Sequence, residues 1–198
     1  ELAARALHYD SKRSKYPFFA INCASLKTDL LENEFFGHVK GAFTGATDIK
    51  DGIVKIADKG TLFIDEVTDM NSHIQASLLR FIEIGTFRPM GSPKECKVDV
   101  RIIAAVNRNI EKEVEEKKFR NDLYYRLNVC RIDVPPLRER KEDIPLLLDY
   151  FLASKMSADN SKITITPDAR KLLTSVSWLG NVRELYHILE RAILTLED

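Results

Sequence analysis

Short apolar runs recur along the first two thirds of the chain, each bounded by glycine, proline or charged residues. Runs of this kind are typical of strands that are covered on both faces of a sheet. We assign four of them to strands: PFFAINC (17–23), GTLFIDE (60–66), VDVRIIAAVN (98–107) and CRIDVPP (130–136).

Helical patterns lie between these runs, at 1–8, 26–37, 71–85 and 110–118. The pattern at 71–85 is the clearest, because Ile74, Leu78 and Phe81 recur at helical spacing and Gly85 follows as a stop. Strands that alternate with helices indicate an α/β fold with a parallel sheet and helices on both faces.

After Pro136 the pattern becomes purely helical. Thr166 followed by Pro167 predicts a helix start, with a capping hydroxyl and a proline at the first helical position. We therefore expect an α/β subdomain at 1–136 and a small all-helical subdomain at 137–198. The three predicted helices of the second part are 141–156, 166–176 and 180–196.

Composition narrows the function classes. Lys and Arg together number 30, as do Asp and Glu, so the formal net charge is zero and gives no electrostatic basis for unaided nucleic-acid binding. No run of 18 apolar residues predicts a membrane span, and no leader pattern opens the sequence. The cysteines, Cys23, Cys96 and Cys130, form no CxxC pair. We expect reduced thiols and a cytoplasmic location.

Polar side chains stand at the ends of three predicted strands. They are Asn22, then Asp65 with Glu66, then Asn107. Because ligands of open parallel sheets bind at the carboxyl ends of the strands, we expect these side chains to converge. An Asp there can bind Mg²⁺ directly or through water, and a Glu beside it can polarise an attacking water. The alternative is that strands end in polar residues simply where they reach solvent.

GAFTGA (41–46) places one large aromatic, Phe43, among small residues and two glycines. With this motif the chain resembles the central AAA+ ATPase domain of bacterial enhancer-binding proteins, the NtrC-like activators of sigma-54 RNA polymerase. The other segments that carry the resemblance are GTLFIDE (60–66), VRIIAAVN (100–107), FRNDLYYRLNV (119–129), PPLRERKEDIPLL (135–147) and GNVREL (180–185).

The resemblance implies an AAA+ P-loop NTPase-type fold with a helical lid, and roles for the residues at the strand ends. GTLFIDE would be the Walker B segment, in which Asp65 serves Mg²⁺ and Glu66 activates water for ATP hydrolysis. Asn107 resembles the first sensor. Asn22 resembles the asparagine that holds the Walker B glutamate until activation.

Three arginines receive roles by the same resemblance. Arg120 and Arg126 match the candidate arginine fingers, with Arg126 preferred, and Arg183 matches the second sensor on the lid. A planar guanidinium suits phosphate contacts. Without the resemblance, Arg120 and Arg126 would be interpreted as a solvated face of a basic helix and Arg183 as a local cap.

The resemblance also gives GAFTGA a partner. In this family it is the tip of a loop that contacts sigma-54 near the pore of a ring, so the loop residues Gly41, Ala42, Phe43, Thr44, Gly45 and Ala46 become candidate contacts. A turn with Phe43 folded onto the core is the alternative. PMGSPKECK (89–97) would be the second pore-facing loop.

The sequence also departs from the family. It holds no G-x-x-x-x-G-K, the P-loop that family members carry directly before the segment that begins here at Glu1. We expect a chain that lacks this loop and the first strand to be inactive alone, and its parent to be an ATPase. Leu179 replaces the usual Pro, and Val106 the usual Thr.

By resemblance the parent forms a homo-oligomer, for which we expect a hexamer, with a heptamer or an inactive dimer as alternatives. It reaches enhancer DNA only through a domain outside this chain, and no membrane is involved. Two other functions compete with this interpretation. One is a DNA-binding module built from the last two predicted helices. The other is a generic AAA+ remodeller or nucleotide-binding scaffold without sigma-54 contact.

Overall fold

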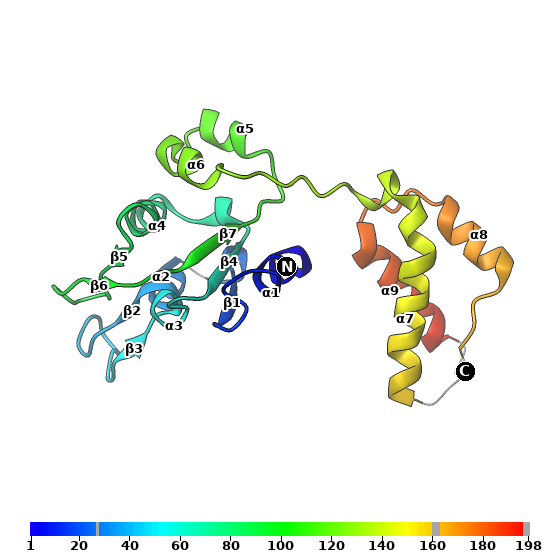
Figure 1. Ribbon diagram of the computed structural model, residues 1–198, viewed down its shortest axis with the longest axis horizontal. Helices are drawn as coiled ribbons and strands as arrows, with labels where there is room; N and C mark the ends of the chain where they lie inside the picture. The colour runs from blue at the N-terminus through cyan, green and yellow to red at the C-terminus, as the bar shows by residue number, and fades with distance from the viewer. Residues whose placement is uncertain (27, 160–162, 196–198) are drawn as a thin grey trace. The chain divides into compact units, whose positions relative to one another are not determined.

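A computed structural model describes residues 1–26, 28–159 and 163–195. Lys27, within the predicted helix 26–37, and residues 160–162 and 196–198, within the predicted helical part, lie outside the described residues. The chain divides into two compact units, Glu1–Arg131 and Ile132–Asp198, which are described separately (Figure 1).

The first unit is built on a three-stranded parallel sheet. Its strands are β1 (Phe18–Asn22), β4 (Thr61–Asp65) and β7 (Arg101–Ala104), in the spatial order β1-β4-β7. The central strand β4 is buried from Thr61 to Ile64 because neighbours cover both edges and both faces, which explains its unbroken apolar run. The three strands predicted at 17–23, 60–66 and 98–107 are confirmed.

Helices cover both faces of this sheet. The crossovers β1–β4 and β4–β7 run in the same direction across the sheet, so their right-handed connections place α2 (Thr28–Phe36), α3 (Ile53–Ile56) and α4 (Ser72–Ile84) on one face. On the other face lies α1 (Leu2–Tyr9) (Figure 1). Two short helices, α5 (Ile110–Glu115) and α6 (Asn121–Leu127), follow β7, and α6 packs against α4.

The core of this unit lies between the sheet and the helices α2 and α4, which cover one of its faces. Asn71 caps α4 by accepting a hydrogen bond from the backbone N–H of Ile74 at 2.8 Å. Gly85 ends the helix, as the sequence predicts. The largest side chains of this core that are buried almost completely are Leu31, Phe35, Leu62, Ile64, Ile74, Leu78, Phe119 and Leu123.

Two short hairpins extend from the sheet layer. In the first, β2 (Gly37–His38) pairs antiparallel with β3 (Lys50–Asp51). In the second, β5 (Thr86–Phe87) pairs antiparallel with β6 (Cys96–Lys97). The first hairpin carries GAFTGA, and the second carries most of the Gly/Pro-rich segment 89–97.

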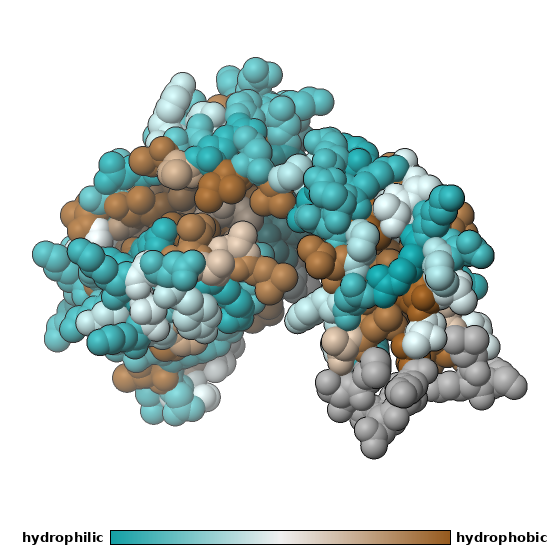
Figure 2. Space-filling view, turned by 45° about the vertical axis from the view of Figure 1, so that its right-hand side comes forward, coloured by the Kyte–Doolittle hydropathy of each residue, from teal (hydrophilic) through white to brown (hydrophobic). Residues whose placement is uncertain are grey.

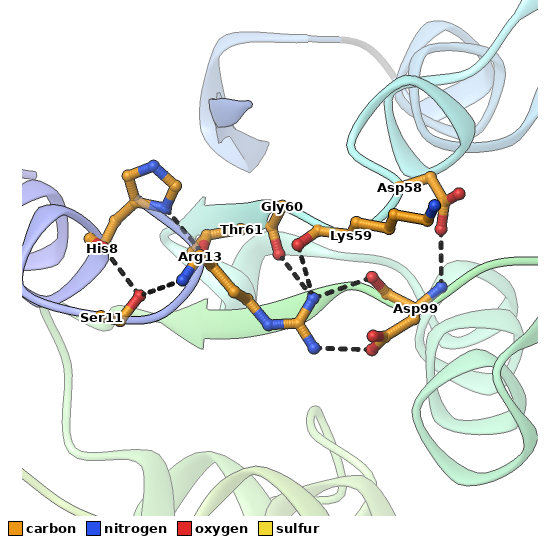
Figure 3. Close-up of polar contacts among 8 residues, drawn as sticks. All are labelled: His8, Ser11, Arg13, Asp58, Lys59, Gly60, Thr61 and Asp99. Atoms are coloured by element: carbon orange, nitrogen blue, oxygen red, sulfur yellow. Dashed lines mark hydrogen bonds and ion pairs between the residues drawn. The ribbon is translucent and has the colours of Figure 1, made fainter. Parts of the chain in front are cut away.

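A polar cluster joins α1 to the edge where the strands begin (Figure 3). The Arg13 guanidinium donates to the carbonyl oxygens of Lys59 and Asp99 at 2.7 and 3.0 Å and to the Asp99 carboxylate at 2.7 Å. His8 Nδ1 and Thr61 Oγ1, both buried, lie 2.9 Å apart in a hydrogen bond. This edge is therefore occupied by structural contacts, in contrast to the opposite edge where the strands end.

The predicted strand at 130–136 is wrong. Residues 131–136 have no regular secondary structure, and the side chains of Val129, Ile132 and Val134 are exposed by 83%, 60% and 65%. A strand needs a neighbour for its ladder of hydrogen bonds, and within the described residues the outer edge of β7 pairs with no strand.

Surface hydrophobic areas between hydrophilic residues are visible in both units (Figure 2).

The second unit is all-helical, as predicted. It begins with two turns of 3₁₀ helix, η3 (Leu137–Glu139) and η4 (Lys141–Asp143), and continues with α7 (Ile144–Asp159), α8 (Pro167–Ser175) and α9 (Asn181–Leu194). Thr166 caps α8 through its hydroxyl, and Pro167 opens the helix. Its core is formed by Leu137, Ile144, Leu148, Phe151, Trp178, Leu185 and Leu189. Among the described residues, no helix is long and apolar enough to cross a membrane.

Candidate functional site

Asn22 and Asp65 face each other at the carboxyl ends of β1 and β4. The parallel register pairs them directly, and the Asn22 amide nitrogen donates to Asp65 Oδ2 at 3.3 Å. The other end of the amide is fixed, because its oxygen accepts from the backbone N–H groups of Ala24 at 2.8 Å and Ser25 at 3.1 Å. These contacts cap the short helix η1 (Cys23–Ser25) and direct the amide nitrogen toward the carboxylate.

Glu66 adopts a left-handed backbone conformation, with φ of 54° and ψ of 47°. This conformation costs about 1–3 kcal/mol for a residue other than glycine. It turns the chain out of β4 into the short helix η2 (Val67–Asp69) and brings the carboxylate beside β7. There the Asn107 amide nitrogen donates to Glu66 Oε1 at 2.8 Å. The structure thus brings all four polar residues of the strand ends into two side-chain pairs.

The pairing differs from the expected one. By resemblance Asn22 should hold Glu66, whereas in the structure Asn22 binds Asp65 and Asn107 binds Glu66. The register explains the first pair, since Asn22 lies opposite Asp65 in the ladder. The left-handed turn explains the second, because it directs the Glu66 side chain toward the continuation of β7.

Asp65 and Glu66 are only half-buried, so a ligand can reach both carboxylates. Their charges affect the neighbouring thiol: burial raises the pKa of Cys23 to about 12, and the carboxylates of Asp69, Asp65 and Glu66 add to the increase. No group of three or more His, Cys, Asp or Glu side chains in the described part of the chain could hold a metal ion by itself. One or two carboxylates, completed by water and phosphate oxygens, are what Mg²⁺ commonly uses. Asp65 fits this arrangement.

Two of the three candidate arginines lie at opposite ends of α6. Arg120 occupies the N-cap position, and its guanidinium pairs with both carboxylate oxygens of Asp122 at 3.0 and 2.6 Å. Hydrogen bonding from Arg120 holds the pKa of Asp122 below its usual value. Arg126 lies in the last turn, is exposed, and has no hydrogen-bonding or ionic partner among the described side chains.

The third candidate, Arg183, belongs to the second unit. It lies in the first turn of α9, and its side chain is exposed. Within the described residues of the first unit, neither Arg120 nor Arg126 makes a hydrogen bond or ion pair with a strand-end residue.

The GAFTGA segment forms the tip of the first hairpin. Its ends are closed by a hydrogen bond from the Gly41 N–H to the Ala46 carbonyl at 2.9 Å, and the Ala46 N–H donates to the Phe43 carbonyl at 3.0 Å. Gly41 and Gly45 have φ of 81° and 103°, a region that residues with a side chain rarely adopt, so the turn requires glycine at both positions. Thr44 is exposed.

Phe43 belongs to neither the core nor open solvent. Its side chain is 42% exposed, and one side of the ring lies on the imidazole of His38, with ring centroids 5.0 Å apart. His38 is itself fixed, because its Nδ1 hydrogen-bonds with Asn33 Oδ1 at 2.7 Å. The turn therefore has a defined backbone and presents an aromatic edge.

The two hairpins are joined at their bases. The Val39 N–H donates to the Met90 carbonyl at 3.1 Å, and the Met90 N–H donates to the Gly37 carbonyl at 2.9 Å. Gly91 approaches Ala42 so closely that a Cβ at Gly91 would lie 2.7 Å from the Ala42 Cβ. A shift of one hairpin must therefore be accommodated by the other.

Sequence reasoning missed Gln75. It is a completely buried polar residue of α4 whose amide makes three hydrogen bonds. A signal was present in the helical pattern, because Gln75 stands three residues before Leu78 and seven before Ile82, on the apolar face. What the pattern cannot give is the partner, which lies 45 residues away in the chain at Arg120.

Comparisons with known proteins agree with this architecture. The model of the "Sigma-54 interaction domain" family matches residues 1–133, and that of the "AAA+ ATPase lid domain" matches residues 138–198. The regulatory protein AtoC of Escherichia coli is 50% identical over 98% of this chain and 42% of its own length. The transcriptional regulator NtrC of Salmonella typhimurium is 51% identical over 93% of this chain and 40% of its own length.

Solved structures give the same result. NtrX from Brucella abortus superimposes with a TM-score of 0.91 at 38% identity, covering 100% of this chain and 45% of that chain. Hsp104, at 15% identity and a TM-score of 0.68, supports the fold alone. This chain thus spans less than half of the length of the relatives named here. Its fold is the expected α/β, P-loop NTPase-like one with a helical lid, and the chain belongs to the Sigma-54 interaction domain family of NtrC-like activators.

Proposed function

We propose that this chain forms the ATP-hydrolysing and sigma-54-contacting part of a ring-forming activator of sigma-54 RNA polymerase. The observation that carries the proposal is the pair of amide–carboxylate contacts at the strand ends, Asn22 with Asp65 and Asn107 with Glu66. Two carboxylates held by neutral donors at the ligand-binding edge of a parallel sheet suit phosphate chemistry better than a structural role.

Glu66 acts on the attacking water. Its Oε1 accepts a hydrogen bond from the Asn107 amide nitrogen at 2.8 Å, which orients the carboxylate, and its other oxygen can accept a hydrogen bond from water. The carboxylate takes the proton of that water as the water oxygen bonds to the γ-phosphorus of ATP, while the bond from that phosphorus to the bridging oxygen breaks and ADP leaves. Asn107, which is hydrogen-bonded to Glu66, acts as the first sensor and responds to the loss of the γ-phosphate.

Asp65 would hold Mg²⁺, directly or through water, while Asn22 keeps the carboxylate oriented. Bound Mg²⁺ neutralises phosphate charge as it develops. The cradle for the phosphates is a P-loop, which these 198 residues do not contain. Residues 1–198 alone are therefore expected to show no turnover. Support for a nucleotide ligand comes from the relative NtrX of Brucella abortus, solved in complex with ATP and with ADP.

The arginines supply the positive charges that contact the phosphates of the nucleotide, and they lie on helices and not at the strand ends. Arg126 has no competing partner among the described residues, so its guanidinium is available as a finger for the nucleotide of a neighbouring subunit. Arg120 would first have to leave Asp122. Arg183, in the first turn of the lid helix α9, serves as the phosphate sensor. A site completed in trans requires a homo-oligomeric ring, for which we propose a hexamer.

The GAFTGA turn contacts sigma-54. Phe43 offers an apolar edge that is 42% exposed and stabilised when a partner covers it. The junction between the hairpins links the movement of this turn to the second loop, at Met90 and Gly91. A generic remodeller would not need this turn, and zero net charge disfavours direct DNA binding by this chain.

A paired assay tests the proposal in the full-length protein. Glu66→Ala should reduce phosphate release by orders of magnitude. Thr44→Ala removes a hydroxyl and a methyl group from an exposed turn position, so it should leave hydrolysis and ring formation near normal while abolishing sigma-54 co-migration on native gels in the presence of a transition-state analogue. Parallel loss of both activities in Thr44→Ala, with a lowered melting temperature, would falsify the coupling role of the turn.

A further inference from the structure

Gln75 is a polar side chain inside the apolar core of the first unit. Its exposure is 0%, and its neighbours on α4, Ile74, Leu78 and Phe81, all belong to the core cluster. A buried amide is costly unless its N–H groups and its oxygen are paired. Its presence on an apolar face therefore indicates a specific set of partners.

The amide is paired with two segments of the chain. Its nitrogen donates to the Met70 carbonyl at 2.8 Å and to the Lys118 carbonyl at 3.0 Å, and its oxygen accepts from the Arg120 N–H at 2.9 Å. Met70 ends η2, the turn that directly follows Glu66. Arg120 is the N-cap of α6, the helix that carries Arg126. One side chain thus joins the turn after the proposed catalytic base to the start of the helix with the proposed finger.

The geometry fixes the start of α6 in orientation as well as in place. Gln75 donates to residue 118 and accepts from residue 120, so both ends of the amide bind one short stretch of backbone. The reverse orientation of the amide would bring N–H against N–H and oxygen against oxygen. Between the two contacts, Phe119 is 2% exposed and packs into the same core.

The two ends of this connection are not equally dependent on Gln75. The turn at Met70 is also held by backbone hydrogen bonds, from the Val67 N–H to the Ala105 carbonyl and from the Met70 N–H to the Val67 carbonyl. On the other side, the Lys118 and Phe119 N–H groups both donate to the Glu113 carbonyl of α5, at 2.9 and 3.0 Å, whereas the Arg120 N–H at the start of α6 donates to the Gln75 oxygen. Loss of the amide should therefore move α6 more than it moves Glu66.

We propose that Gln75 is a positioning residue for the arginine finger, which fixes α6 so that Arg126 reaches the nucleotide of the neighbouring subunit. The inference rests on the proposed function of Arg126. A purely structural role, in which Gln75 only stabilises the fold, is the alternative.

Mixed rings of the full-length protein separate these roles. Gln75→Met keeps the side-chain length and removes the amide, and homogeneous rings should lose hydrolysis roughly 10- to 100-fold, the scale of a misplaced catalytic group. Mixing with Glu66→Ala protomers, which supply intact fingers, should restore activity at the interfaces where Gln75→Met supplies Glu66. Mixing with Arg126→Ala protomers should not, because the only fingers are then the misplaced ones.

The reverse pattern, rescue by Arg126→Ala and not by Glu66→Ala, would place the effect at Glu66 and overturn the proposal. If the Glu66→Ala and Arg126→Ala protomers change the hydrolysis of Gln75→Met rings equally, and the melting temperature is lowered, Gln75 has only a structural role. Leu78→Ala, a buried apolar change on the same helix, is the matched control and should not discriminate between partners. If Gln75→Met does not fold, Gln75→Asn, which keeps the amide on a shorter side chain, enters the same mixtures. Inactive mixtures of Glu66→Ala with Arg126→Ala alone would instead refute the trans finger itself.

Discussion

The strand-end site and the GAFTGA turn are ordered in opposite ways. At the strand ends, side chains fix one another: two amides hold two carboxylates, and the ladder register and a left-handed turn set where they meet. In the turn, the backbone is fixed by hydrogen bonds and by two glycines, while Phe43 and Thr44 remain exposed. A catalytic site needs preorganised side chains. A surface that meets a partner needs a defined shape with side chains left available.

Between the two regions lie elements that belong to neither. Helix α2 ends next to the first hairpin, and Asn33 on α2 fixes the imidazole under Phe43. Helix α4 begins just after the turn that follows Glu66 and ends at the second hairpin. These two helices are thus the elements through which the sheet connects to the two hairpins.

The largest expected effect breaks the catalytic side of this comparison and leaves the turn intact. Arg126→Ala in the full-length protein should reduce phosphate release about 10³-fold or more, because a finger stabilises charge in the transition state. Arg126→Lys should not restore it, since an ammonium lacks the planar fork. Lys112→Ala, the loss of an exposed cation from neighbouring α5, is the control and should be near neutral. Retention of more than a tenth of the activity by Arg126→Ala would contradict the role.

The labelling rates of the three cysteine thiols compare the strand-end site with more exposed parts of the chain, without any mutation. Cys23 lies beside the strand-end carboxylates, and burial together with their charges raises its pKa to about 12. At pH 8 almost none of it is thiolate, and the side chain is buried, so iodoacetamide should label it slower than exposed Cys130 by orders of magnitude. Cys96, on the second hairpin and partly exposed, should fall between them.

Peptide mass spectrometry over a time course gives the three labelling rates. A shift from pH 8 to pH 9 should leave Cys23 nearly unlabelled, because pH 9 is still far below its pKa. Labelling of Cys23 and Cys130 at equal rates would show that the strand-end region opens readily to solvent.

Much of the fold can be predicted from local patterns, because local patterns cause it. The run from Leu62 to Ile64 predicts a buried central strand, and the apolar spacing over 71–85 with the stop at Gly85 predicts α4 to within a residue. The convergence of Asn22, Asp65, Glu66 and Asn107 follows from parallel strands alone.

The predictions that were wrong or missing concern contacts with residues that are distant in the sequence. Residues 130–136 have a suitable strand composition, yet a strand forms only beside another strand with free hydrogen-bonding groups. The pairing of Asn22 with Asp65 depends on register, and that of Asn107 with Glu66 depends on a backbone conformation that is unusual for glutamate. Gln75 shows the same limit, since its three partners come from two segments that meet only in the folded chain.

The smallest expected effect concerns the aromatic edge of the turn. The 42% of Phe43 that is exposed corresponds to about 80 Å² of a side chain of roughly 200 Å². Covering that area with sigma-54 contributes about 2 kcal/mol, so Phe43→Ala should weaken sigma-54 binding roughly 30-fold. Phe43→Leu keeps much of the apolar area and should weaken sigma-54 binding only a few-fold.

Hydrolysis in the absence of sigma-54 should be unchanged in both variants, because the turn contributes no side chain to the strand ends. Titration of sigma-54 against the full-length protein with a bound transition-state analogue, paired with phosphate release, measures both quantities. Equal binding by Phe43→Ala and the unmodified protein would assign the ring to its packing on His38 and leave the partner contact to the other residues of the turn.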